Sequence, residues 1–127
     1  MQEKQLFEYA VIRLVPRVER EEFFNVGVIL YCPAQKFLKA ACGLDPQRAR
    51  AFAPELNLPE LEKHVRSFAL VCAGGASAGA IGEMSARERF YWLTAPRSTV
   101  LQTSPVHTGL CSDAQTTLDN LFKNMVG

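Results

Sequence analysis

The sequence predicts an α+β fold: a mainly antiparallel sheet of about four strands with helices packed on it. Two observations lead to this class. The first third of the chain is rich in β-branched and aromatic residues with imperfect alternation, whereas most of the remainder repeats apolar residues at helical spacing. The second observation is the order of the elements. Strands come first, helices follow, and one more strand and a helix end the chain, which is typical of α+β domains. With 127 residues, we expect one domain over residues 1–127.

The strands are predicted from apolar segments bounded by polar connections. Residues 25–32, NVGVILYC, are apolar on both faces, which favours a central strand, and Gly27 among them predicts a close approach by a neighbouring group. A short turn at residues 33–35 leads into the return strand of a hairpin. The four expected strands are 7–14, 25–32, 36–42 and 99–104.

The helices are predicted from caps and from periodicity. Asp45 before Pro46 is a favourable start, and capping boxes are expected at Ser85 and Ser112. Residues 74–82, GGASAGAIG, are small and are interpreted as a linker loop. An apolar stripe at helical spacing is formed by Leu61, Val65, Phe68 and Cys72. The expected helices are 46–53, 59–72, 85–93 and 113–126.

The composition argues against several classes of protein. Net charge is +1, from 14 Lys and Arg against 13 Asp and Glu, so a general nucleic-acid surface is not expected. No apolar stretch is long enough to span a bilayer, and the start lacks the pattern of a signal peptide. The four cysteines and two histidines lack metal-ligand spacing. We therefore expect a cytoplasmic protein with reduced thiols, no metal and no cofactor.

Residues 94–110, TAPRSTVLQTSPVHTGL, carry many polar side chains for a segment that includes a strand. Arg97, Ser98 and Thr99 together suit a phosphate or a carboxylate. The alternative, which we favour, is that Arg97 pairs with a carboxylate such as Glu22 and fixes the strand. His107 is a candidate general acid or base, although a loop histidine more often supports turn backbone.

A second group of candidates lies at the end of the first strand and in the connection after it: Arg13, Arg17, Glu22 and Asn25. Charged residues on a connection usually form a solvated surface. Arg13 differs because it interrupts the apolar run AVIRLV, so it belongs to an edge or a polar network. If the last strand pairs with this end of the first, Arg13 and Arg97 would line one anion-attracting groove.

Three segments resemble a known family: YAVIRLVPRVEREEFFNVGVILYCP, ERFYWLTAPRSTVLQTSPVHTGLC and LDNLFKNMV. They are similar to the bacterial family catalogued as domain of unknown function 3037, from about Tyr9 to Val126. The order of residues 94–111 is the most specific part, because no strand or helix pattern dictates it. The resemblance implies a kinase-like protein as partner rather than a reaction.

The sequence therefore favours a non-enzymatic interaction or regulatory module whose expected partner is the kinase-like protein, with a homodimer as a second arrangement. The alternative is a small hydrolase or phosphoester-processing enzyme that uses His107 with Arg97 and Arg13. The two hypotheses predict different surfaces, since the enzyme needs these three side chains around one pocket.

Overall fold

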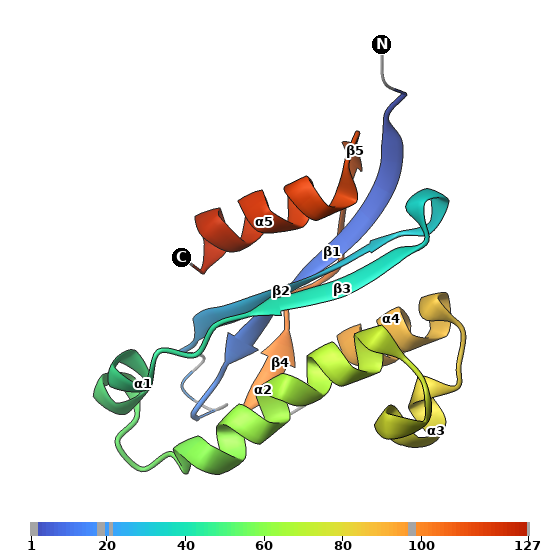
Figure 1. Cartoon of the computed structure of the whole chain (residues 1–127). Coiled ribbons are helices and arrows are strands. Elements are labelled where there is room, and N and C mark those ends of the chain that lie inside the picture. The colour runs from blue at the N-terminus through green and yellow to red at the C-terminus, as the bar shows by residue number, and fades with distance from the viewer. Residues whose placement is uncertain (1–2, 18–19, 21, 97–98, 127) are drawn as a thin grey trace.

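The computed structural model describes residues 3–17, 20, 22–96 and 99–126 (Figure 1). The strands are β1 (Gln5–Leu14), β2 (Phe24–Cys32), β3 (Phe37–Cys42), β4 (Leu101–Thr103) and β5 (His107–Cys111). The helices are α1 (Pro46–Phe52), α2 (Leu58–Ala73), α3 (Gly79–Gly82), α4 (Ala86–Thr94) and α5 (Ala114–Met125). Short 3₁₀ turns include Pro33–Gln35 and Ala76–Ala78.

The five strands form one antiparallel sheet in which β1 is flanked on both sides. β2 pairs with one side of β1, and β3 pairs with β2. On the other side, β4 pairs with residues 12–14 of β1, and β5 pairs with residues 5–9. The prediction of a mainly antiparallel sheet with residues 25–32 inside it is confirmed.

Helices cover both faces of the sheet, with α5 on one face and α2 and α4 on the other (Figure 1). This explains why β2 is apolar on both faces: alternate side chains point into separate clusters. The α2 and α4 side includes Ile12, Leu14, Ile29, Tyr31, Leu61, Phe68, Phe90 and Leu93. The α5 side includes Phe7, Val28, Leu30, Cys32, Cys111, Ala114 and Leu118.

Gly27 lies where groups of both neighbouring strands approach closely, as the sequence predicted. A Cβ atom at this position would lie 2.9 Å from the Ala41 carbonyl oxygen and 3.0 Å from Cδ1 of Ile12. Both distances are shorter than ordinary van der Waals contact. Only glycine therefore fits here without displacing a neighbouring strand.

The helix starts follow the predicted caps, with one correction. The Asp45 carboxylate accepts from the Gln47 backbone N–H at 2.9 Å, and Ser85 Oγ accepts from that of Glu88 at 3.2 Å. The predicted cap at Ser112 is wrong. Helix α5 begins one residue later, so Asp113 occupies the cap position and accepts from the Thr116 N–H at 2.9 Å. Its negative charge also favours the helix N-terminus.

Two further predictions are corrected by the structure. Residues 107–111, where a loop was expected at His107, form the fifth strand, β5, because the first half of β1 offers a free edge for pairing. Residues 74–82 are not a simple linker loop: they hold a 3₁₀ turn and the short helix α3. Ile81 packs against the core there, and the Gly75 N–H donates to the Gly82 carbonyl at 2.8 Å.

The C-terminus of α2 is held by a side chain from α4. Nη1 of Arg89 donates to the carbonyl oxygens of Val71 at 2.9 Å and Cys72 at 2.6 Å, and its Nε donates to that of Met84 at 3.0 Å. The last carbonyls of a helix lack partners within the helix, and a cation at this end is favoured by the helix dipole. Arg89 thus joins α2, α4 and the connection between them.

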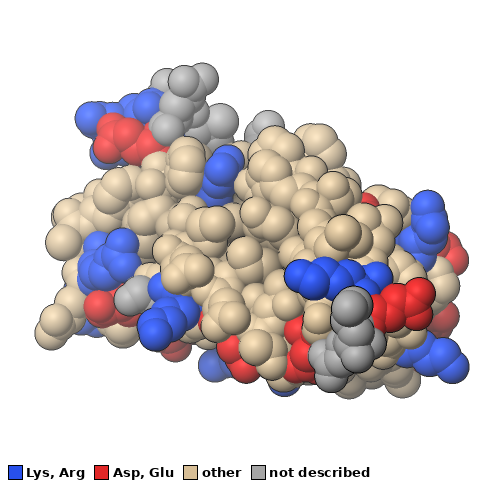
Figure 2. All heavy atoms as spheres, turned by 90° about the horizontal axis from the view of Figure 1, so that it is seen from above, with Lys and Arg blue, Asp and Glu red and all other residues tan. Residues whose placement is uncertain are grey.

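The surface carries its charges in small mixed groups. Figure 2 shows Lys and Arg dispersed among Asp and Glu on the face seen from above, with broad uncharged areas between them. Among the described residues, no helix has the length and apolar character needed to cross a bilayer.

A candidate binding hollow between α2 and β4

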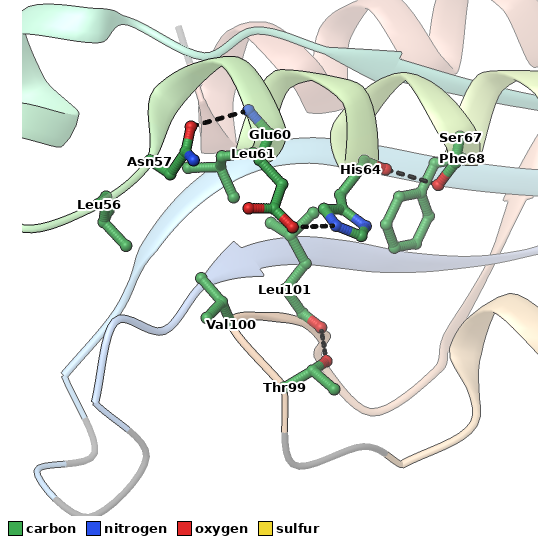
Figure 3. A pocket seen from close by; sticks show the side chains of 10 residues that line it. All are labelled: Leu56, Asn57, Glu60, Leu61, His64, Ser67, Phe68, Thr99, Val100 and Leu101. Atoms are coloured by element: carbon green, nitrogen blue, oxygen red, sulfur yellow. Dashed lines mark hydrogen bonds and ion pairs between the residues drawn. The ribbon is translucent and has the colours of Figure 1, made fainter.

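A hollow of about 490 Å³ lies between helix α2 and the chain that enters β4 (Figure 3). Its apolar lining consists of Leu56, Leu61, Phe68, Val100 and Leu101, and its polar lining consists of Asn57, Glu60, His64, Ser67 and Thr99. The volume lies within the range of about 300–1,000 Å³ typical of ligand pockets. The hollow combines an apolar floor with polar side chains at its rim.

The α2 wall follows from how that helix begins and packs. Asn57 caps it by accepting from the Glu60 backbone N–H at 3.2 Å. Leu61 and Phe68 are buried in the core, so the neighbouring positions 60, 64 and 67 emerge beside them at the surface. Helical spacing of three and four residues therefore aligns an apolar stripe with a polar one along the hollow.

The opposite wall is fixed by hydrogen bonds around Thr99 and Leu101. The Val100 carbonyl accepts from the Val15 N–H at 2.6 Å, which ties this wall to the end of β1. Thr99 Oγ1 donates to the Leu101 carbonyl at 2.7 Å, and Gln102 Nε2 donates to the Thr99 carbonyl at 2.9 Å. Both walls are thus held by core packing and hydrogen bonds within the protein, which makes the hollow preformed.

The polar rim has a defined arrangement. His64 Nε2 lies 3.8 Å from the Glu60 carboxylate, and both side chains are largely exposed. Ser67 Oγ donates to the His64 backbone carbonyl at 2.6 Å, so its proton is engaged by the helix backbone (Figure 3). Among the polar lining residues, Glu60 carries the charge, and His64 is a cation only when it is protonated.

Arg13, the first candidate from the sequence, lies in the half of β1 that pairs with β4, between Asn25 on β2 and Gln102 on β4, so it is not at an edge of the sheet. Its guanidinium carbon lies 4.2 Å from the centre of the Phe23 ring, a cation–π contact. Its buried Nε has no hydrogen-bond partner within the described chain. The expected pairing of β4 with this end of β1 is present, but Arg97, the other half of the predicted groove, lies outside the described residues.

The candidates beyond β1 have partners of their own. Arg17 lies 3.6 Å from the Glu55 carboxylate, and Glu22 pairs with Arg20. Asn25 Nδ2 donates to the Met125 carbonyl at 3.0 Å and so supports the C-terminus of α5.

Of the predicted anion-binding group, only Thr99 is described, and it lines the hollow. Ser98, like Arg97, lies outside the described residues. Thr99 also makes the backbone bond that shapes the wall. The predicted pair between Arg97 and Glu22 therefore has only its Glu22 half described, and that carboxylate contacts Arg20.

His107 lies on β5 and is exposed, with its ring 5.3 Å from that of Tyr9 on the neighbouring strand. Two nearby polar residues that a catalytic histidine could use, Ser104 and Asp113, bond elsewhere. Ser104 is buried and bonds backbone atoms of Val11 and Pro105, whereas Asp113 caps α5. His107 is not among the residues that line the hollow.

A family model for proteins of unknown function, DUF3037, matches residues 9–126. The chain belongs to the DUF3037 family. The match covers both walls of the hollow and all five helices, so the resemblance found in the sequence is confirmed. No curated protein and no solved structure matches the chain.

Sequence reasoning missed most of the polar residues that this member of the family places around the hollow: Asn57, Glu60, His64 and Ser67. Their signal is present in the spacing, because they recur every three or four residues beside the apolar stripe of α2. What the spacing does not show is that Thr99–Leu101 lies opposite. That placement comes from β4 pairing with β1.

Ser104 explains part of the polar character of residues 94–110. It lies between β4 and β5, where its Oγ accepts from the Val11 N–H at 2.9 Å and donates to the Pro105 carbonyl at 2.9 Å. In the gap between β4 and β5, the Ser104 side chain therefore gives a backbone N–H of β1 the acceptor that a neighbouring strand would otherwise provide. Thr103 Oγ1 similarly donates to the Thr94 carbonyl at 3.3 Å. These polar residues fix the segment against β1 and α4.

Replacing Ser104 with alanine should lower the free energy of unfolding by about 1–3 kcal/mol, because the buried Val11 N–H loses its acceptor. Urea unfolding would measure the change. Thr108→Ala, at an exposed position on β5, is the matched control and should leave stability nearly unchanged. Equal stability of Ser104→Ala and wild type would contradict the structural role.

The thiols should react slowly in the folded protein. Burial raises the pKa of Cys42 to about 11 and that of Cys72 to about 12. Both thiols are therefore protonated at about pH 8, and the thiolate is the reactive form. A chromogenic disulfide reagent should react with them far more slowly in buffer than in denaturant. Rapid reaction of Cys42 or Cys72 in the native protein would contradict this.

Proposed function

We propose that this protein is a non-enzymatic interaction or regulatory module that holds a protein partner in the hollow between α2 and residues 99–101. The observation that carries the proposal is the hollow itself. Leu61, Phe68 and Leu101 form its floor while belonging to the core, so the floor is held rigidly. An apolar centre surrounded by a polar rim is the usual anatomy of a protein interface.

The exposure of the wall supports a partner as well. Val100 is 38% exposed although it borders an apolar floor, so a partner that covered it would remove apolar surface from water. A second apolar site lies at the other end of the sheet, where Leu6 and Leu110 lie opposite each other and are 57% and 63% exposed. This second site is where a homodimer would form.

The partner that we propose is a kinase-like protein, as the family resemblance suggests. To test this partner, the tagged full chain is used for affinity capture from a lysate of the organism that makes the protein. Mass spectrometry then identifies the captured proteins. Val100→Ser should reduce the captured kinase-like protein by about three- to sixfold when the tagged chain is limiting, since burying the 38% of Val100 that is still exposed contributes about 0.6–1 kcal/mol. Leu70→Ser is the matched control, because Leu70 is 48% exposed on α2 and does not line the hollow.

Three outcomes would contradict the proposal: absence of a kinase-like protein, equal capture by Val100→Ser and wild type, or equal loss with Leu70→Ser. Size-exclusion chromatography of the purified chain with Leu110→Ser would identify a homodimer, because that variant removes the apolar side chain at the second site. If Leu110→Ser abolishes a dimer and Val100→Ser does not change the capture of any protein, the result would favour self-association as the function.

The alternative function is a small hydrolase or phosphoester-processing enzyme based on His107 with Arg97 and Arg13. Tyr9, the residue paired with His107, is four residues from Arg13 on β1, about 13 Å along an extended strand. An enzyme of this kind would have to bridge that separation with its substrate. Turnover of generic phosphoesters or carboxylic esters that His107→Ala abolishes would favour the enzyme and displace the interaction module. We expect no such turnover.

A further inference from the structure

We propose that the segment of the partner that enters the hollow carries an apolar side chain next to a lysine or arginine, with the cation placed at Glu60. This inference deepens the proposed function and rests on it. Helix α2 supplies both part of the apolar floor and the carboxylate of Glu60, so an apolar surface and a negative charge lie side by side in the hollow (Figure 3).

The apolar requirement comes from the floor and the wall that faces it. Leu61, Phe68 and Leu101 lie at the bottom, and Val100 and Leu56 border the opening. An aliphatic or aromatic side chain that entered the hollow would contact part of this apolar lining. Because these floor residues already pack in the core, the hollow does not need to be assembled at the moment of binding, which reduces the entropy cost of association.

The charge requirement comes from Glu60. Its carboxylate is on the rim, and no lysine or arginine is among the lining residues that the structure describes. The one polar contact of this carboxylate in the described rim is with His64 at 3.8 Å, longer than a hydrogen bond. The carboxylate is therefore open to a cation from a partner.

A basic residue suits both parts of the hollow. Lysine and arginine lay their aliphatic carbons along apolar surface while their charged ends stay at the water boundary. Such a side chain would lie along the apolar lining with its charged end at the Glu60 carboxylate, since both belong to the same hollow. An acidic segment would instead bring a second negative charge to Glu60, so the charge selects between partners.

The probe is a phage-displayed library of random linear peptides, panned against the immobilised full chain. Enriched peptides should share a leucine, isoleucine or phenylalanine close to a lysine or arginine. The best of them, synthesised with a fluorophore, gives a Kd by fluorescence polarisation at low salt. Enrichment of acidic peptides, or of apolar peptides without a cation, would overturn the proposal.

Two pairs of variants separate this inference from the proposed function. Glu60→Gln should raise the Kd by about three- to fivefold at low salt, as expected for an exposed ion pair, and high salt should reduce this difference. Glu62→Gln, also on α2 but not lining the hollow, should leave the Kd unchanged. An unchanged Kd in Glu60→Gln would overturn the charge requirement.

Val100→Ser and Leu70→Ser complete the design. If Val100→Ser weakens peptide binding but Glu60→Gln does not, the hollow binds a partner segment and only the basic residue is wrong. If neither variant changes binding, or if Leu70→Ser weakens it as much as Val100→Ser, both the inference and the proposed site fail. Thermal melting of each variant confirms that the comparison is made on folded protein.

Discussion

Replacing Arg89 with alanine should lower the free energy of unfolding by about 2–4 kcal/mol, because the partly buried carbonyls of Val71 and Cys72 lose a charged donor. This is a large share of the roughly 5–15 kcal/mol that stabilises a domain of ordinary size. Gly74 makes the contact possible: it has a φ of +77°, and a Cβ there would lie 3.0 Å from Nη1 of Arg89. Chemical denaturation would measure the loss.

Arg87→Ala is the matched control, since Arg87 lies on the same helix and its guanidinium carbon is 5.4 Å from the centre of the exposed Tyr91 ring. It should cost much less stability than Arg89→Ala. Arg89→Lys should fall between them, because an ammonium keeps the charge but lacks the planar fork. Equal stability of the two alanine variants would show that Arg89 does not hold the end of α2.

Phe90→Ala should destabilise the fold by about 3–5 kcal/mol, the range for removing a buried phenylalanine ring. Phe90 is fully buried, and its ring centre lies 5.5 Å from that of Tyr31 on β2, so α4 loses a buried ring contact with the sheet. Thermal and urea unfolding would measure the loss. Tyr91→Ala, at the next and exposed position, should have a much smaller effect. Similar losses in both variants would contradict this account of the core.

The sequence predicts the helices of this protein well because their signals are local. The start of α1 follows from Asp45 and Pro46, and that of α4 follows from Ser85, where a side-chain oxygen accepts from the first turn. The inner position of residues 25–32 follows from their apolar character on both faces. Each signal lies within a few residues of the element that it predicts.

Strand β5 and the hollow escaped prediction because both depend on contacts between distant segments. Strand β5 has little strand character of its own, and it forms because the first half of β1 offers an unpaired edge. The hollow likewise needs α2 and residues 99–101 to lie opposite each other, which the pairing of β4 with β1 brings about. Sequence periodicity marks Glu60, His64 and Ser67 as one polar stripe but does not show what faces it.

The central claim is that a partner occupies the hollow between α2 and residues 99–101. Hydrogen exchange of the full chain, with and without the purified kinase-like partner, tests it directly. The account predicts slower exchange of amides in the first half of α2 and at residues 99–101, with little change in β5. Slower exchange confined to β5 and the first half of β1, around Leu6 and Leu110, would contradict it.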